Sequence, residues 1–458
     1  MTVQQMARAL FVIAIVHTLF LTGWFNKLAH NHPEGSIREN LYHFLGEAEV
    51  VFGLWAAVFF FGIFYVEGIE VAVGYLEGKL KGKEINFIEP VFVFVVMAMA
   101  STRPILELAE TVIEKASKLL PMGEARAFYV SALILGPLLG SFITEPAAMT
   151  VTALLLLKRY YSKGISEKLK YATLGILFVN ISIGGTLSHF AAPPVLMVAA
   201  KWGWGMSDMI GSFGYKAAIA VVLNTLMVAL LFKDELESLS QSTVIAFDPT
   251  LSRKKRKQLV RKSKKKDEQE ESSLMPVTWW LTLCHIVFLA VAVYFNHHMV
   301  IFIAAFLFFL GLVQVTQEYQ KPPELKGPIL VGFFLGGLVT LGGFQAWWLQ
   351  PILEKMDDLT LFVGATSLTA ITDNAALTYL GTLIEGLSES ARFALVAGAV
   401  SGGGLTVMAN APNPAGNSIL GKSFEEGITA VGLFKAAFIP TLVAMACIWL
   451  LPSIGGSS

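Results

Sequence analysis

Long uncharged apolar stretches dominate this chain and limit what it can fold into. A helix needs about 20 apolar residues to cross the hydrocarbon core of a membrane. Of all residues 55% are hydrophobic and 15% are charged, against about 25% charged in a typical soluble domain. We therefore expect an all-α polytopic membrane protein with about 10 transmembrane helices. The predicted spans are 9–26, 48–72, 86–102, 171–200, 211–232, 277–296, 298–317, 327–344, 393–421 and 430–452.

Three sequence motifs of the first half recur, in the same order, in the second half. The pairs are RPILE at 103–107 with QPILE at 350–354, TEPAAMT at 144–150 with TDNAALT at 372–378, and GGTLSHFAAP at 184–193 with GGLTVMANAP at 403–412. The first half contains an odd number of predicted crossings, so the second half is expected to be inverted, as in many transporters. We predict a first repeat over 1–233 and a second over 277–458.

A polar segment, 234–276, separates the two predicted repeats. Ten of the fourteen residues 253–266 are Lys or Arg. The positive-inside rule then predicts a cytoplasmic linker, and lipid headgroups are a more credible partner for it than nucleic acid. Amphipathic stretches at 103–119 and 345–358 are predicted to lie along the membrane interface.

Two stretches, 127–157 and 359–384, each hold one acidic residue in the middle of an otherwise uncharged run. Their lengths suit two half-length helices, so we predict re-entrant hairpins. A lone carboxylate is costly within a membrane and marks a functional site by default, which singles out Glu145 and Asp373. The alternative is that each carboxylate only caps a half-helix. The neighbouring side chains that add polar atoms are Thr144, Thr372, Thr378 and Asn374.

Glycine and proline interrupt the uncharged stretches 171–200 and 393–421 at matching places. Irregular backbone survives in a membrane only where protein or water surrounds it, so we predict two helices broken near mid-membrane; the alternative is a packing kink. A break exposes carbonyl groups that suit a cation and amide groups that suit an anion. The residues at the predicted breaks are Gly184, Gly185, Ser188, His189 and Pro193 in the first stretch, and Gly403, Gly404, Asn410, Pro412, Asn413 and Asn417 in the second.

The predicted chemistry is competition between a proton and a cation. Burial in apolar surroundings raises the pKa of a carboxyl group, which can then hold a proton near neutral pH, whereas a bound cation favours the charged form. We expect Na+ near Asp373 and Asn374, with Glu145 as a second acid and no cofactor beyond the transported Na+ and H+. The sequence contains no H-E-x-x-H, G-x-S-x-G or G-x-G-D motif, so no enzyme is predicted.

These motifs resemble the ion transporter superfamily, which includes NhaD-type sodium/proton antiporters, arsenite carriers and divalent-anion/sodium symporters. Thr372-Asp373-Asn374 is similar to the Asp-Asn signature of the NhaD-type antiporters, and the segment 402–417 resembles the broken helix that follows it. More narrowly, the chain resembles the bacterial family labelled "Putative Na+/H+ antiporter". The resemblance implies scaffold spans (here 9–102), a transport domain with elevator-like motion, a homodimer and the bacterial inner membrane. Glu145-Pro146 departs from the expected Asp-Asn pattern, so the two half-sites are expected to be unequal.

The resulting hypothesis is exchange of Na+ (or Li+) for H+. The alternative is a Na+-coupled symporter of an anion such as a dicarboxylate. Such a carrier would need neutral hairpins and a basic residue for its substrate. Here both hairpins are acidic, and neither predicted broken helix contains a lysine or arginine.

Overall fold

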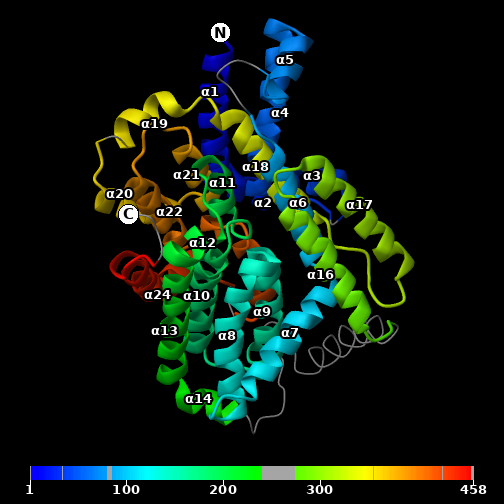
Figure 1. The fold of residues 1–458 in the computed structure, drawn as a ribbon, viewed down its shortest axis with the longest axis vertical. Helices are drawn as coiled ribbons and strands as arrows, with labels where there is room; N and C mark the ends of the chain where they lie inside the picture. The colour runs from blue at the N-terminus through cyan, green and yellow to red at the C-terminus, as the bar shows by residue number, and fades with distance from the viewer. Residues whose placement is uncertain are drawn as a thin grey trace.

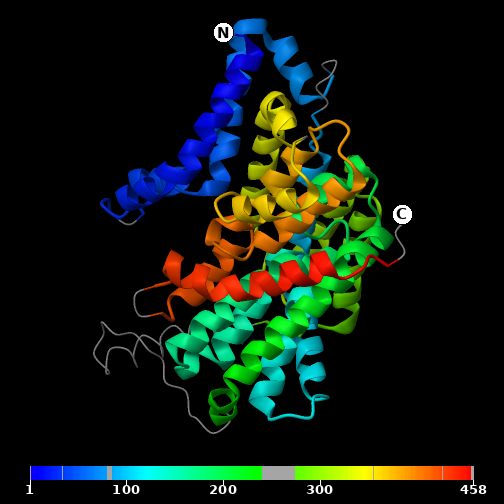
Figure 2. The ribbon, with the colours of Figure 1, turned by 90° about the vertical axis from the view of Figure 1, so that its left-hand side faces the viewer.

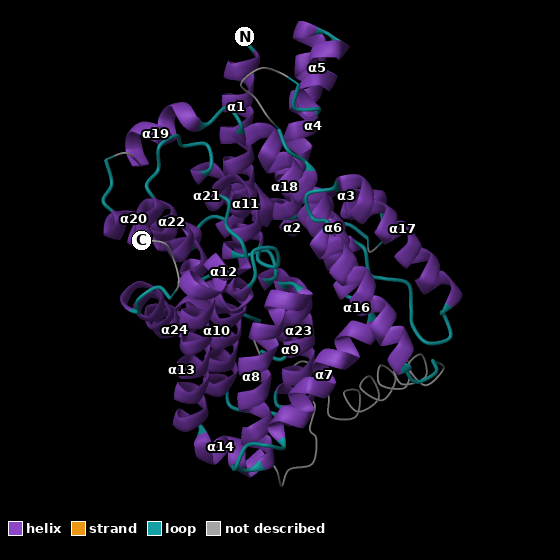
Figure 3. Ribbon diagram, in the orientation of Figure 1, coloured by secondary structure: helices purple, strands orange, loops and turns teal. Residues whose placement is uncertain are grey.

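The computed structural model describes residues 2–33, 35–79, 85–239, 274–353, 355–424 and 427–454, and every regular element among them is a helix (Figures 1 and 3). Residues 240–273 of the predicted linker lie outside the described residues, as does Glu354 of the predicted interfacial helix. The first residues of the predicted linker are helical: α14 covers Lys233–Ser238.

The first predicted span, 9–26, lies within a longer helical run interrupted by one π-helical turn, His17–Leu21. The second predicted span, 48–72, is divided at Gly68, whose φ of +90° favours glycine. The helices of this region are α1 (Val3–Val16), α2 (Thr22–Ala29), α3 (Ile37–Leu45), α4 (Ala48–Glu67), α5 (Ile69–Leu76), α6 (Ile88–Ala100) and α7 (Arg103–Ser117).

The remaining helices follow the predicted stretches with small shifts at their ends. In the first half they are α8 (Glu124–Ile143), α9 (Glu145–Arg159), α10 (Glu167–Gly184), α11 (Pro193–Trp202), α12 (Met206–Met209) and α13 (Tyr215–Leu231). In the second half they are α16 (Trp279–Tyr294), α17 (Met299–Val315), α18 (Lys326–Gly342), α19 (Ala346–Leu353), α20 (Asp358–Thr369), α21 (Asn374–Gly381), α22 (Glu389–Gly402), α23 (Asn413–Gly421) and α24 (Ala430–Leu450).

Five helices among the described residues are long and apolar enough to cross a membrane, and two bent pairs raise this number to seven at most. The pairs are α6 with α7, bent by 68°, and α18 with α19, bent by 85°. Three more apolar helices, α1, α16 and α17, are shorter. The all-helical, apolar character predicted from the sequence is therefore confirmed, whereas the count of about 10 spans is not.

The described helices form two groups, each with its own buried apolar residues. The scaffold group is α1–α6 with α16–α18 (residues 3–100 and 279–342), and its core includes Phe52, Phe92 and Phe302 together with Leu196 of α11 and Ala375 of α21, where the two groups meet. The hairpin group is α8–α13 with α20–α24 (residues 124–231 and 358–450). Figure 1 shows α1 and α5 of the scaffold group at the end of the molecule opposite α14.

Helix α10 is the most enclosed element of the hairpin group, since it packs against α8, α9, α13, α22 and α24. Figure 2 shows α24, in red, running across this group. Elements from both halves of the chain thus build one core, and α10 brings its C-terminal break to the middle of it.

Asn180 ties α10 to its neighbours through a buried hydrogen-bond network. Its amide nitrogen donates to the carbonyl of Leu133 and to the hydroxyl of Thr225, both at 3.1 Å. Its amide oxygen accepts from Asn224, which also donates to the carbonyl of Pro440. Asn180 therefore joins four helices rather than facing the break.

We expect Asn180→Ala to lower the free energy of unfolding by about 1–2 kcal/mol, because interhelical hydrogen bonds in membranes are individually modest. The melting temperature of the detergent-purified protein measures this effect. A melting temperature equal to that of the wild type would contradict the structural role.

Candidate functional site

Helices α8 and α9 cover the stretch predicted as a re-entrant hairpin, and we call this pair the first hairpin. They are joined by a turn at a single residue, and α8 alone is long enough to cross a membrane. Thr144 has a φ of +72°, the only positive φ of a non-glycine residue in the described chain. Such a conformation is strained and persists only where the surroundings enforce it. It places Glu145 at the first position of α9, fully buried, with Pro146 next in the first helical turn, where a missing amide hydrogen costs nothing.

The first break lies between α10 and α11 and is held by the first hairpin. The hydroxyl of Ser141, on α8, donates to the carbonyl of Gly184 at 2.7 Å and accepts from the amide of Leu187 at 2.9 Å. A Cβ on Gly185 would lie 2.6 Å from Oε1 of Glu145. The backbone of the break therefore packs directly against the carboxylate, and only glycine fits there. Pro193 begins α11 on the far side of the break.

The second break lies between α22 and α23 and is closed by its own asparagine. The side-chain amide of Asn413 donates to the carbonyls of Gly403, at 2.7 Å, and Thr406, at 2.8 Å. The hydroxyl of Thr406 donates at 2.9 Å to the carbonyl of Ala370, at the end of α20. The second break is thus bonded to the second hairpin, as the first break is bonded to the first. Pro412 immediately precedes α23.

The second hairpin consists of α20 and α21, and its two polar residues differ in role. Asp373 is the N-cap of α21: Oδ1 accepts from the backbone amides of Ala375, at 2.8 Å, and Ala376, at 3.1 Å. Asn374 is fully buried, and neither its amide oxygen nor its amide nitrogen has a hydrogen-bond partner among the described residues. A Cβ on Gly403 would lie 2.9 Å from Nδ2 of Asn374, so the second hairpin touches the second break here.

One hydrogen bond joins the two halves of the chain at the centre of the hairpin group. Nδ2 of Asn410, in the second break, donates to Oε2 of Glu145, in the first hairpin, at 2.9 Å. Asp373 also lies close enough to Glu145 for electrostatic repulsion between their carboxylates. The tips of both hairpins and both breaks therefore meet in one buried region.

This region contains several buried polar atoms without a hydrogen-bond partner among the described residues. Native structures leave few such atoms, and each needs an explanation such as a bound ion or water. The atoms are Oγ1 of Thr144, Oε1 of Glu145, Oγ of Ser188, Oδ1 and Nδ2 of Asn374, Oγ of Ser401, Oδ1 of Asn410 and Oδ1 of Asn413. Most are oxygen atoms, the donors that hard cations prefer.

Other residues predicted for the site are engaged elsewhere or lie at its edge. The hydroxyls of Thr372 and Thr378 donate to carbonyls of their own hairpin, at Leu368 and Ala375. Asn417 is half-buried, one turn beyond Asn413 on α23. His189 faces Asn296 of the scaffold group, with 3.5 Å between the nitrogen atoms. Gly404 packs against the backbone of Val179.

Glu49 was not predicted from the sequence as a residue near the site. This half-buried residue lies in the first turn of α4, close enough to Asp373 for electrostatic repulsion. Glu49 stands at the start of an apolar stretch, where a charged residue is common at the end of a membrane span. Only the tertiary packing of the scaffold group next to the second hairpin brings the two carboxylates near each other. No group of three or more His, Cys, Asp or Glu side chains suited to a metal ion occurs among the described residues.

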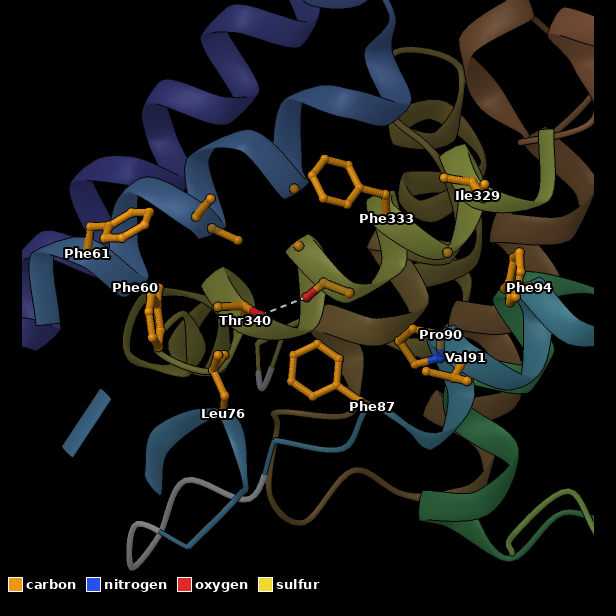
Figure 4. A pocket seen from close by; sticks show the side chains of 16 residues that line it. Phe60, Phe61, Leu76, Phe87, Pro90, Val91, Phe94, Ile329, Phe333 and Thr340 are labelled. Atoms are coloured by element: carbon orange, nitrogen blue, oxygen red, sulfur yellow. Dashed lines mark hydrogen bonds between the residues drawn. The ribbon is translucent and has the colours of Figure 1, made fainter. Parts of the chain in front are cut away.

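A cavity among the scaffold helices is not the ion site. It has a volume of about 560 Å³ and lies between α4, α6 and α18. Figure 4 shows its lining, which includes Phe60, Phe87 and Phe333 and no charged side chain among the described residues. Its one hydroxyl, on Thr340, already donates to the carbonyl of Gly336.

The apolar helices and the buried polar region between hairpins and breaks define an integral membrane protein of the transporter class. Residues 2–451 match the model of the family described as "Putative Na+/H+ antiporter". The chain belongs to this family, as its resemblance to it predicted, and a transporter family implies that the protein is not an enzyme.

Two further comparisons add little to the family assignment. No curated protein matches the sequence. Among solved structures, the chain is similar to the Alcanivorax borkumensis YdaH transporter, a crystal structure described as having an unusual topology. The sequences are 13% identical, the match covers 94% of this chain and 96% of that chain, and the TM-score is 0.44.

Proposed function

We propose that the protein exchanges Na+ (or Li+) for H+ across the membrane, with Glu145 as the group for which the two cations compete. The observation that carries this proposal is the bond between Glu145 and Asn410, surrounded by unpaired buried oxygen atoms. A protonated Glu145 carries no net charge and fits the dry interior. A bound Na+ instead compensates the carboxylate and accepts the free oxygen atoms as ligands.

The residues around Glu145 have distinct parts in this mechanism. Oδ1 of Asn410 and Oδ1 of Asn413 accept no hydrogen bond from the described residues, whereas the amide nitrogens of both side chains donate within the site. These oxygens can therefore face a cation without breaking the hydrogen bonds that hold the second break. Asn374 adds a further free oxygen from the second hairpin. Release of the proton and binding of Na+ are then alternative states of one site.

The charge of the linker indicates on which side of the membrane it lies. We propose that residues 234–276 are cytoplasmic and that the protein lies in a bacterial inner membrane, because ten basic residues within 253–266 favour the cytoplasmic side. The two predicted repeats, 1–233 and 277–458, are proposed to be inverted relative to each other, and the protein is proposed to act as a homodimer in contact with membrane lipids.

The test uses purified protein in liposomes that contain a pH-sensitive dye. Addition of Na+ or Li+ is expected to move protons, and buffer alone is not. The N-terminus of α23, which follows Asn410 of the second break, would also suit an anion. If no cation moves protons in correctly inserted protein, exchange is excluded. Uptake of a labelled dicarboxylate driven by Na+ would then establish the symporter instead.

Paired variants of Asp373 separate its charge from its capping role. Asparagine is as good an N-cap as aspartate, whereas alanine costs about 1 kcal/mol at this position. We expect Asp373→Asn to retain the melting temperature but to weaken Na+-driven proton movement, because a negative charge near Glu145 is lost. Asp373→Ala should lower both. Full transport by Asp373→Asn would show that Asp373 only caps α21.

A further inference from the structure

A second cavity, of about 270 Å³, lies where the scaffold group meets the hairpin group. It differs from the apolar cavity in Figure 4 because polar and ionisable side chains contribute to its wall. Its lining comes from the start of α6, the first break, α11 with the loop after it, and the loop between α16 and α17. The residues are Ile88, Glu89, Phe92, His189, Leu196, Ala199, Ala200, Gly203, Trp204, Gly205, Asn296 and His297.

The ionisable side chains that line this cavity make few hydrogen bonds to the rest of the protein. Nδ1 of His189 is buried and has no hydrogen-bond partner among the described residues, and Nε2 lies 3.5 Å from the Asn296 amide. Glu89 accepts one hydrogen bond, from Asn86 at 2.9 Å, and is the only acidic residue among the described lining residues. Buried water satisfies such atoms when the space is polar and large enough.

The cavity lies between the loop surface and the first break. Ala200 and His297 of its lining are exposed, so one end opens at the surface. At the other end, His189 belongs to the first break, four residues after Gly185, which packs against the carboxylate of Glu145. A cation that reached His189 would therefore stand at the backbone that borders the site.

The cavity also lies at the ends of α6 and α16 that are away from the linker. It contains the start of α6 and the residues just after α16. The opposite end of α6 is next to the linker, because Arg103 donates to the carbonyl of Met275 at 3.1 Å, and α16 begins at Trp279 shortly after it. The mouth of the cavity and the linker are therefore at opposite ends of α6 and α16.

From these observations we infer that this cavity is a water-filled access vestibule, open on the side opposite the 234–276 linker, in which Glu89 attracts the transported cation. The inference rests on the proposed function for its cargo. A single acidic group in a narrow polar space concentrates cations and raises their rate of arrival. Glu89 thereby affects how much Na+ reaches the site and leaves the exchange step unchanged.

Cysteine labelling tests the vestibule without any transport. The chain has two cysteines, so Cys284→Ala and Cys447→Ala provide the background for Asn296→Cys. A charged, membrane-impermeant thiol reagent, applied to right-side-out vesicles, is expected to label it. Lys168→Cys, exposed in the first turn of α10, should react only after permeabilisation. Phe308→Cys, exposed on apolar α17, should not react.

Two labelling results would overturn the inference. If Asn296→Cys stays unlabelled from both sides while Lys168→Cys reacts after permeabilisation, the cavity holds no accessible water. If Asn296→Cys reacts only after permeabilisation, the cavity opens on the linker side instead. Neither result depends on exchange activity. A labelling result that contradicts the vestibule can therefore be distinguished from a transport result that contradicts the proposed function.

Transport kinetics test the role of Glu89. We expect Glu89→Gln to raise the apparent KM for Na+ about three- to tenfold at low ionic strength with the maximal rate unchanged. Salt with an inert cation should reduce the difference, because it screens the charge. Glu318→Gln, at an exposed position near the linker end of the scaffold group, is the matched control and should leave KM unchanged. An unchanged KM in Glu89→Gln, or a fall in the maximal rate alone, would overturn this role.

Discussion

Glu145→Gln is expected to reduce Na+-driven proton movement to the background of empty liposomes. Glutamine has nearly the shape of glutamic acid, and its side-chain oxygen can still accept from Nδ2 of Asn410, as Oε2 of Glu145 does. The fold and the contact between the two halves should therefore persist. The variant, however, can neither release a proton nor compensate a bound cation, so both halves of the exchange fail. The measurement is dye quenching in liposomes after addition of Na+, with the melting temperature recorded in parallel.

The control for this variant is an acid of the same hairpin that lies outside the site. Glu124, at the start of α8, is exposed, and Glu124→Gln should transport like the wild type. Glu145→Asp keeps the charge but shortens the side chain, so it should retain a small part of the activity. Wild-type exchange in Glu145→Gln would remove Glu145 from the mechanism. Aggregation of Glu145→Gln would be visible in its melting curve. In that case Glu145→Asp, which keeps the charge, still tests the role of this carboxylate.

The sequence located the acids and the interruptions because both are local signals. Glu145 and Asp373 are conspicuous as lone charges in apolar runs, and helices α9 and α21 begin at or next to them. Glycine and proline likewise predicted where α10 and α22 end. The matched motifs at 103–107 and 350–354, in contrast, lie at the start of α7 and the end of α19. The similar residues of these two motifs therefore occupy different positions within their helices.

The contacts between distant segments could not be predicted from the sequence. Asn410 bonds to Glu145 across 265 residues, and local patterns carry no information on such pairings. The same limit explains Glu49, whose proximity to Asp373 depends on how the scaffold group packs. Asn180 has the residue type expected of a cation ligand, yet two neighbouring helices, α8 and α13, occupy its hydrogen-bonding groups. The inverted relation of the halves remains a prediction, since it depends on the position of the membrane.

Gly403→Ala is expected to abolish exchange although it changes no charge. A Cβ at this position would overlap Oγ of Ser182, on α10, and would lie 2.9 Å from Nδ2 of Asn374, closer than real Cβ atoms approach other atoms. Overpacking of this kind costs about 1–3 kcal/mol, so the protein should still fold while the second break moves away from α10 and from the second hairpin. Gly311→Ala on α17 meets nothing within 4 Å and is the matched control for both melting temperature and transport. Exchange at the wild-type rate in Gly403→Ala would show that the close packing of the second break against α10 and Asn374 does not shape the ion site. The proposed ligands would then reduce to those around Glu145 and Asn410.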